Sequence, residues 1–65
     1  MTIGEKINEL RKKNNMTFSQ LAKKSGVSIV TLSNWNKGKT NPQLVAVKKV
    51  ADALNCDFEE LKRFL

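Results

Sequence analysis

Thr17-Phe-Ser-Gln-Leu-Ala-Lys-Lys-Ser-Gly-Val-Ser-Ile-Val-Thr-Leu-Ser-Asn-Trp-Asn-Lys37 is the stretch that decides the fold of this chain. Thr17 precedes Gln20 by three residues, which is the spacing of a capping box, and Ser28 can cap a second helix. Gly26 lets the first helix end and the second begin almost at once, and Ala22 is small enough for the two helices to cross closely. The stretch therefore predicts two short helices joined by a tight turn.

Similar signals predict further helices on both sides of this stretch. Three more starts have an N-cap residue followed by an acidic residue three positions on, or by proline at the first helical position. They are Thr2-x-x-Glu5, Asn41-Pro42 and Asp57-x-x-Glu60. Helix ends are expected before residues that accept a left-handed backbone, namely Asn15, Gly38 and Asn55. The chain is expected to be all-α, with helices at about 2–14, 17–25, 28–37, 42–54 and 57–64 in a single domain over 1–65.

Apolar residues recur at helical spacing in each of these segments, which predicts one shared core. The expected core residues are Ile3, Ile7, Leu10, Leu21, Ala22, Leu32, Trp35, Leu44, Val47, Val50, Ala51, Leu54, Phe58 and Leu61. Trp35 could instead stack on a nucleic-acid base, but its spacing from Leu32 favours the core. Cys56 is expected to act as a small hydrophobe and not as a reactive thiol.

The charge of the chain is +6 and is unevenly distributed. From Leu10 to Ala51 there is no acidic residue. The basic residues of this segment, called here the basic block, are Arg11, Lys12, Lys13, Lys23, Lys24, Lys37, Lys39, Lys48 and Lys49. One lysine pair alone would indicate only a solvated helix face, whereas cations without counter-charges favour a nucleic-acid partner. No segment is typical of a membrane span or signal sequence, so we expect a soluble, cytoplasmic protein.

The composition argues against catalysis. The 65 residues include no His and one Cys, which disfavours imidazole catalysis, a Cys/His zinc site and a disulfide within the chain. The basic block has no paired carboxylates for metal-assisted phosphodiester chemistry. Aromatic residues for stacking on single strands are scarce. We therefore expect a binding protein with no metal and no cofactor.

The segment 28–37 has the pattern of a helix that lies in a DNA groove. Leu32 and Trp35 define its inner face at about 100° per residue. The outer positions are then Val30, Ser33, Asn34 and Lys37. A helix of about three turns that exposes small polar groups fits the major groove, where base edges present distinguishable donors and acceptors.

These features resemble the lambda repressor and Cro-like helix-turn-helix family, also called the Xre family, over nearly the whole chain. The matching motifs are Ile7-Asn-Glu-Leu-Arg11, Met16-Thr17, Gln20-Leu-Ala22, Gly26-Val-Ser28, Leu32-Ser-Asn-Trp35, Gly38-Lys-Thr40, Pro42 and Ala51-x-Ala53-Leu54. The resemblance implies a compact five-helix domain that binds operator DNA, with the helix-turn-helix at the second and third helices. The helix that begins at Ser28 would be the recognition helix.

The resemblance also implies which residues contact DNA. Base contacts fall at Ile29, Val30 and Asn34, with Ser33 beside them. Phosphate contacts, by side chain or by backbone N–H, fall near Phe18, Ser19, Lys37, Lys39, Thr40 and Asn41. The family usually has Gln at the position of Phe18. It usually has Glu at the position of Asn36, paired with the arginine matching Arg11, so either a neutral hydrogen bond replaces that ion pair or Arg11 is available to a phosphate.

We therefore expect a sequence-specific regulator of transcription, a repressor, that binds double-stranded DNA as a homodimer on a palindromic operator. Apolar Phe58, Phe64 and Leu65 suggest a weak dimer through the last helix, although they could simply pack as a tail. Phe18, Ile29 and Val30 form an apolar corner that could contact thymine methyl groups or merely cover the core. In an alternative function, this corner would dock a partner protein.

Overall fold

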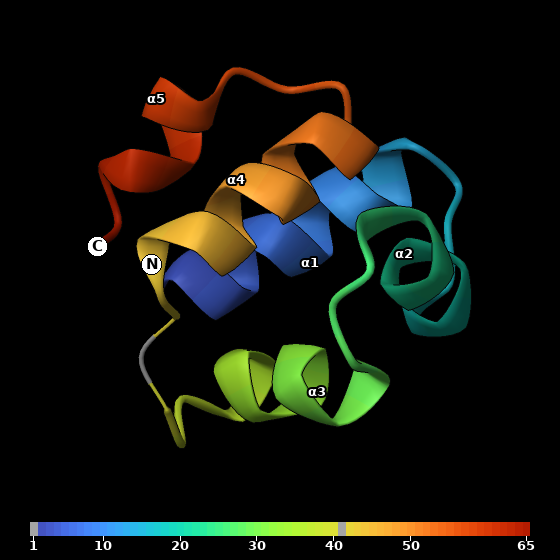
Figure 1. Ribbon diagram of the computed structural model, residues 1–65, viewed down its shortest axis with the longest axis horizontal. Helices are drawn as coiled ribbons and strands as arrows, with labels where there is room; N and C mark the ends of the chain where they lie inside the picture. The colour runs from blue at the N-terminus through green and yellow to red at the C-terminus, as the bar shows by residue number, and fades with distance from the viewer. Residues whose placement is uncertain (1, 41) are drawn as a thin grey trace.

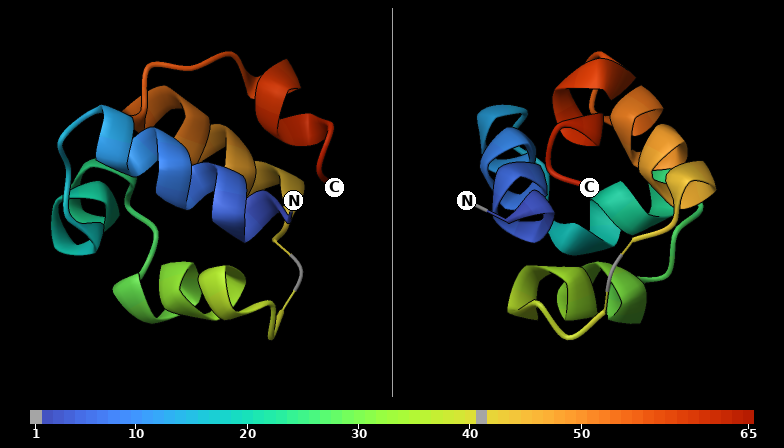
Figure 2. Two further views of the ribbon diagram at one scale, coloured as in Figure 1. Left: turned by 180° about the vertical axis from the view of Figure 1, so that it is seen from behind. Right: turned by 90° about the vertical axis from the view of Figure 1, so that its left-hand side faces the viewer.

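The computed structural model describes residues 2–40 and 42–65, and these ranges contain five helices and no strand. The helices are α1 (Ile3–Lys13), α2 (Phe18–Ser25), α3 (Ile29–Lys37), α4 (Leu44–Ala53) and α5 (Phe58–Lys62). Helix α3 packs against α1 and α2, whereas α5 packs against α4 and α1 on the opposite side of the molecule (Figure 1, Figure 2). The expected all-α, five-helix class is confirmed.

Side-chain caps explain where α1 and α2 begin. The Thr2 hydroxyl accepts from the Glu5 amide at 3.2 Å, and the Thr2 amide donates to the Glu5 carboxylate at 2.9 Å. This backbone hydrogen bond lowers the pKa of Glu5 from its ordinary value. Thr17 and Gln20 form the same reciprocal pair, at 3.1 and 2.9 Å. Both capping boxes were predicted from their spacing and are confirmed.

The starts of α4 and α5 differ from expectation. Helix α4 begins at Leu44 after an extended Gln43, so the start predicted at Asn41-Pro42 is wrong, and Asn41 itself lies outside the described residues. Pro42 lies in the connection before the helix, where its fixed φ suits a non-helical backbone. Asp57 caps α5 through the Glu59 amide at 3.2 Å, without the expected return bond from Glu60, and α5 ends at Lys62 instead of residue 64.

Each of the four connections between helices contains a residue with positive φ. Asn15 and Asn55 both have φ of 56°, and Gly38 has φ of 73°, as their positions after helices predicted. Gly26, in the turn between α2 and α3, has φ of 77°. This left-handed region disfavours residues with a Cβ, so glycine lets α2 end sharply there.

The core combines residues from all five helices. The buried apolar side chains are Ile3, Ile7, Leu10, Leu21, Val27, Leu32, Trp35, Val47, Val50, Ala51, Ala53, Leu54 and Leu61. Trp35 is thus a core residue, as predicted. Val27 and Ala53 were not among the expected core residues, and Ala22 and Phe58 are only half-buried against it.

Leu44 was expected in the core, but 54% of it is exposed. Its spacing from Val47 gave the correct helical stripe, but Leu44 is the first residue of α4 and lies at the edge of the molecule. There, Ile3, Pro42, Phe64 and Leu65 form an open groove with it. Helical spacing gives the direction of a side chain, whereas burial also requires a neighbour that covers it.

The backbones of α1 and α3 touch at Gly4. A Cβ at Gly4 would lie 2.5 Å from the Trp35 carbonyl carbon and 2.8 Å from the Asn36 Cα, both backbone atoms. Glycine is therefore required for this close approach. The contact fixes α3 against α1 with its Trp35 side pointing inward.

Candidate nucleic-acid interface

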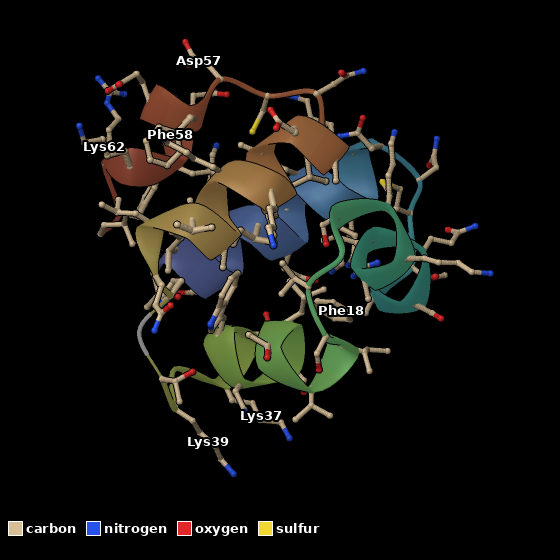
Figure 3. The ribbon with its side chains drawn as sticks, viewed as in Figure 1. Phe18, Lys37, Lys39, Asp57, Phe58 and Lys62 are labelled. Carbon is tan, nitrogen blue, oxygen red and sulfur yellow. The ribbon has the colours of Figure 1, made fainter. Side chains whose placement is uncertain are left out.

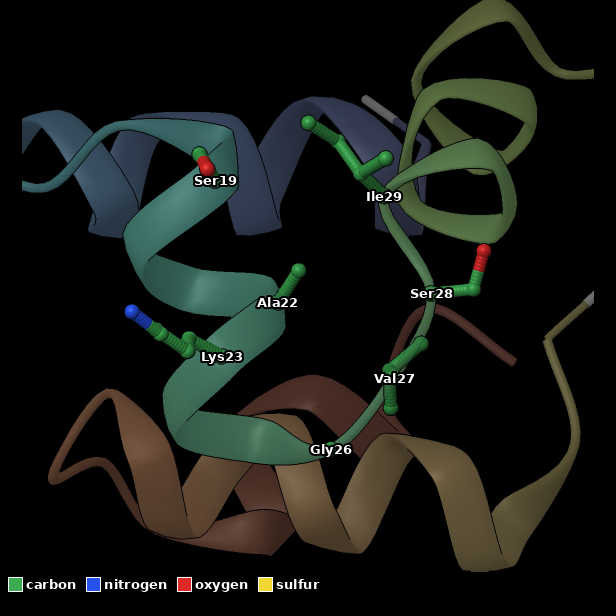
Figure 4. Close-up of a pocket in the computed structure, with 7 residues that line it drawn as sticks. All are labelled: Ser19, Ala22, Lys23, Gly26, Val27, Ser28 and Ile29. Carbon is green, nitrogen blue, oxygen red and sulfur yellow. The ribbon is translucent and has the colours of Figure 1, made fainter.

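A tight turn fixes the start of α3 beside α2. The Gly26 amide donates to the Ala22 carbonyl at 2.8 Å, and the Val27 amide donates to the Ser25 hydroxyl at 3.2 Å. Ser28 then caps α3 by accepting from the Val30 amide at 3.1 Å. An open hollow of about 500 Å³ lies between α2 and this turn (Figure 4). It is lined by Ser19, Ala22, Lys23, Gly26, Val27, Ser28 and Ile29.

The outer face of α3 is accessible over most of its length. Val30 is 64% exposed, Lys37 is exposed, and Ser33 and Asn34 are half-buried. The side chain of Asn34 has no hydrogen-bond partner among the described residues, and only its backbone carbonyl is engaged, accepting from the Lys39 amide at 2.9 Å. The predicted outer stripe of this helix is therefore open to a ligand, and it includes an amide with donors and acceptors available.

The cations of the basic block are unpaired. All of them are exposed except Arg11, which is partly buried. Within residues 2–40 and 42–65, the one ion pair is Lys6 to Glu9 at 3.2 Å, which lies outside the block. Lys37 and Lys39 extend away from the body of the molecule near the end of α3, and Lys62 lies at the far side (Figure 3). The α3 side of the molecule thus offers free positive charge to an anion.

The start of α2 has backbone donors available. The Phe18 and Ser19 amides are the first two of the helix, and neither has an acceptor in the described chain. Such N–H groups at a helix start favour a phosphate. The contacts expected near Phe18 and Ser19 can therefore come from the backbone, with no need for the glutamine side chain usual in the family.

Arg11 does not form the expected neutral hydrogen bond with Asn36, and part of its guanidinium is engaged elsewhere in the chain. Its Nε and Nη2 donate to the Asn8 side-chain oxygen at 3.2 and 2.7 Å, and its Nη1 donates to the Met16 carbonyl. Its guanidinium carbon lies 4.4 Å from the centroid of the Phe18 ring. Arg11 thus makes no bond to Asn36 and is engaged within the chain. It connects the end of α1 to the start of α2.

Sequence reasoning missed this Asn8–Arg11–Phe18 cluster. Asn8 and Arg11 stand three residues apart on a helix, a spacing at which side chains meet, so their hydrogen bond could have been found. The contact of Arg11 with Phe18 depends on how the connection after Asn15 turns back. No pattern in the sequence states that geometry.

The environment of Cys56, near Asp57 and Glu60, does not favour a reactive thiol. Cys56 is half-buried, and burial, followed by the charges of Glu60 and Asp57, raises the pKa of its thiol. This environment therefore favours the neutral form of the thiol, as expected for a small hydrophobe.

Among the described residues, no group of three or more His, Cys, Asp or Glu could hold a metal ion. None of the five described helices has the length and hydropathy of a membrane span.

Comparison with known proteins gives matches over most of the chain. A family model described as helix-turn-helix matches residues 7–61. The HTH-type transcriptional repressor RghR of Bacillus subtilis is 38% identical over 61 residues, which cover 92% of this chain and 45% of RghR. An uncharacterized HTH-type transcriptional regulator of Archaeoglobus fulgidus is 41% identical over 56 residues, covering 86% of this chain and 79% of that protein.

A viral protein is among the relatives. The immunity repressor protein of Bacillus phage phi105 is 37% identical over 54 residues, which cover 83% of this chain and 38% of the repressor. The chain thus spans less than half the length of RghR and of the phage repressor. The matched region in each case includes the two helices and the turn described above.

Proposed function

Because this chain belongs to the helix-turn-helix family of lambda repressor and Cro-like proteins, we propose that it represses transcription by occupying a specific operator in double-stranded DNA. It acts by binding alone, without catalysis or a cofactor, in the cytoplasm. The names of RghR and the phage immunity repressor support repression.

The observation that carries this proposal is the outer face of α3. It combines the available amide of Asn34, the exposed Val30 and the exposed Lys37 on one helix. The surrounding basic block contains no acidic residue that would repel a phosphate backbone. A helix with these properties fits the major groove.

The proposed contacts divide into two groups. Ile29, Val30, Ser33 and Asn34 contact base edges. Phosphates are bound at the start of α2 by the Phe18 and Ser19 amides. They are also bound at the end of α3 by the exposed residues Lys37, Lys39 and Thr40. A phosphate contact by Asn41 stays a prediction outside the described residues. Arg11 has fewer N–H groups left for a phosphate than was expected, because three of its nitrogens donate within the chain.

Selection of bound duplexes from a random pool tests the proposed function. We expect one sequence motif to be enriched after a few rounds, and the protein to prefer that duplex over a scrambled one by at least about 1,000-fold. Enrichment of no motif, with equal affinity for all duplexes, would contradict sequence-specific binding. Specific capture of a protein with no DNA affinity would favour a protein-docking module instead.

Asn34→Ala is expected to weaken binding to the selected duplex by about 1–3 kcal/mol and to relax preference at one base pair. The reason is that the amide of Asn can bond adenine N6 and N7 together. Asn36→Ala is the matched control, because it removes an exposed amide of the same helix outside the outer stripe. Affinities measured on every single-base variant of the operator provide the check. Equal weakening on all sequences would instead indicate that Asn34 binds a phosphate.

We also propose that the protein forms a weak two-fold dimer on a palindromic operator. The support is the apolar groove of about 590 Å³ formed by Ile3, Pro42, Leu44, Phe64 and Leu65, in which Leu44 and Leu65 are about half exposed. Phe58 was also expected to contribute; it does not line this groove, and the Lys48 ammonium lies 5.4 Å from its ring centroid. In a symmetric dimer, the two α3 helices would contact half-sites about 34 Å apart.

Leu44→Ser is expected to weaken this dimer at least about tenfold, because it removes much of the apolar surface that would be buried. Val45→Ser is the matched control: Val45 is 66% exposed, on the same turn of α4, but does not line the groove. Sedimentation equilibrium of the wild type and both variants measures the dissociation constant. A wild-type monomer both at high concentration and on the full operator would refute the dimer.

A further inference from the structure

The start of α3 presents apolar side chains where a DNA-contacting helix usually needs polar ones. Ile29 is 46% exposed and Val30 is 64% exposed, and these are the first two residues of the helix. About half of Ile29 and most of Val30 are therefore open to a ligand. Figure 4 shows Ile29 directed across the hollow toward the first turn of α2, where Ser19 lies.

Phe18 lies at the start of α2, toward which Ile29 is directed, and it is held in place. It is the first residue of α2, is half-buried and packs against the core. The Arg11 guanidinium lies over its ring, and Arg11 is itself fixed by the Asn8 side chain and the Met16 carbonyl. Arg11 is therefore a positioning residue for Phe18, whose ring has little freedom to move around a ligand.

Two backbone donors at the start of α3 are already used by its cap. The Ser28 hydroxyl accepts from the Val30 amide at 3.1 Å and from the Thr31 amide at 3.5 Å. The side chains of Phe18, Ile29 and Val30 have no donor or acceptor, so these side chains offer a ligand apolar contact alone.

We propose that the corner of Phe18, Ile29 and Val30 recognises thymine in the operator through the C5 methyl group. This inference rests on the proposed function, since it places the start of α3 in the major groove. On that groove floor, the methyl of thymine is the one large apolar feature among the base edges. The unpaired cations of the basic block favour DNA over an apolar protein partner as the occupant. Val30, the most exposed of the three, makes the main contact.

Replacing each thymine of the selected operator with deoxyuridine tests the proposal with the wild-type protein. The replacement removes one methyl and keeps every base-pairing group and groove acceptor. Burial of one methyl-sized group predicts that at least one replacement weakens binding about fourfold. If no replacement reaches twofold, or if the enriched half-site contains no thymine, the proposal is overturned while sequence-specific binding stands. If no motif is enriched at all, the proposed function fails and the inference fails with it.

A double-mutant cycle assigns the methyl to the corner. Val30→Ala is expected to bind the thymine operator more weakly and to lose the thymine-to-uracil difference at the sensitive position. Asn34→Ala is the control, because it alters another contact of the same helix and should retain that difference. A difference of unchanged size in Val30→Ala, and also in Ile29→Ala and Phe18→Leu, would place the methyl elsewhere and overturn the proposal. Unchanged DNA affinity in all three variants would leave the corner for a protein partner and overturn it too.

Discussion

Gly4→Ala is expected to prevent the chain from adopting this fold. The added Cβ would overlap the Trp35 carbonyl group and approach the Asn36 Cα to 2.8 Å, and backbone atoms cannot rotate away as a side chain can. Helices α1 and α3 would have to separate, which would open the core around Trp35. A domain of this size is stabilised by only about 3–5 kcal/mol, so this separation is expected to consume most or all of its stability.

Local helix propensity predicts the opposite sign for the same change. Ala in a helix interior is favoured over Gly by about 1 kcal/mol, so a gain in stability would be expected if α1 were an isolated helix. Urea denaturation followed by circular dichroism decides between the two. Gly38→Ala is a useful comparison: its Cβ would meet open space, and the φ of 73° predicts a cost of only about 1–2 kcal/mol. A Gly4→Ala protein as stable as the wild type would contradict the α1–α3 contact.

The affinity for non-specific duplex DNA is expected to fall about 500-fold between 50 and 200 mM salt. Release of about five condensed counterions per monomer gives a log–log slope of −4 to −5. The physical cause is the basic block, whose exposed lysines have no ion-pair partner in the described chain. Fluorescence anisotropy with a labelled duplex over this salt range measures the slope. A slope near zero would contradict DNA binding by this surface.

Single lysine variants locate the surface responsible. Lys37→Gln and Lys39→Gln should each make the slope less steep by about one unit, because each removes one of the proposed phosphate contacts. Lys62→Gln is the matched control, since Lys62 is exposed on α5 at the far side of the molecule (Figure 3). An equal effect of Lys62→Gln would indicate diffuse attraction to net charge instead of an oriented interface.

The starts and ends of the helices were predictable where a local hydrogen bond or dihedral angle decides them. Thr2 and Thr17 cap their helices within three residues, and Asn15 and Asn55 have the positive φ that their positions suggested. The start of α4 was predicted wrongly because Pro42 is compatible with a helix start and also with an extended connection. Which one forms depends on how the chain returns from α3 to the core.

The candidate site was predictable to the extent that it follows from helical geometry. Leu32 and Trp35 face inward, so Val30 and Lys37 face outward, as their spacing requires. The contacts that fix the site could not be predicted in this way. The approach of Gly4 to α3 and the position of Arg11 over Phe18 both join separate helices, and no periodicity within one helix describes them.

The close contact at Gly4 means that the residues of α3 that hold it in the fold differ from the residues that it exposes to a ligand. Its backbone and inner residues are fixed by α1 and the core, whereas Val30 and Asn34 on the outer side contribute little to that packing. Substitutions at such outer positions should change the free energy of unfolding by less than about 0.5 kcal/mol. With Val30 and Asn34 as proposed base contacts, we expect the fold to acquire a new operator by mutation of a few surface codons without passing through unstable intermediates, which would make it a suitable scaffold for engineered DNA specificity.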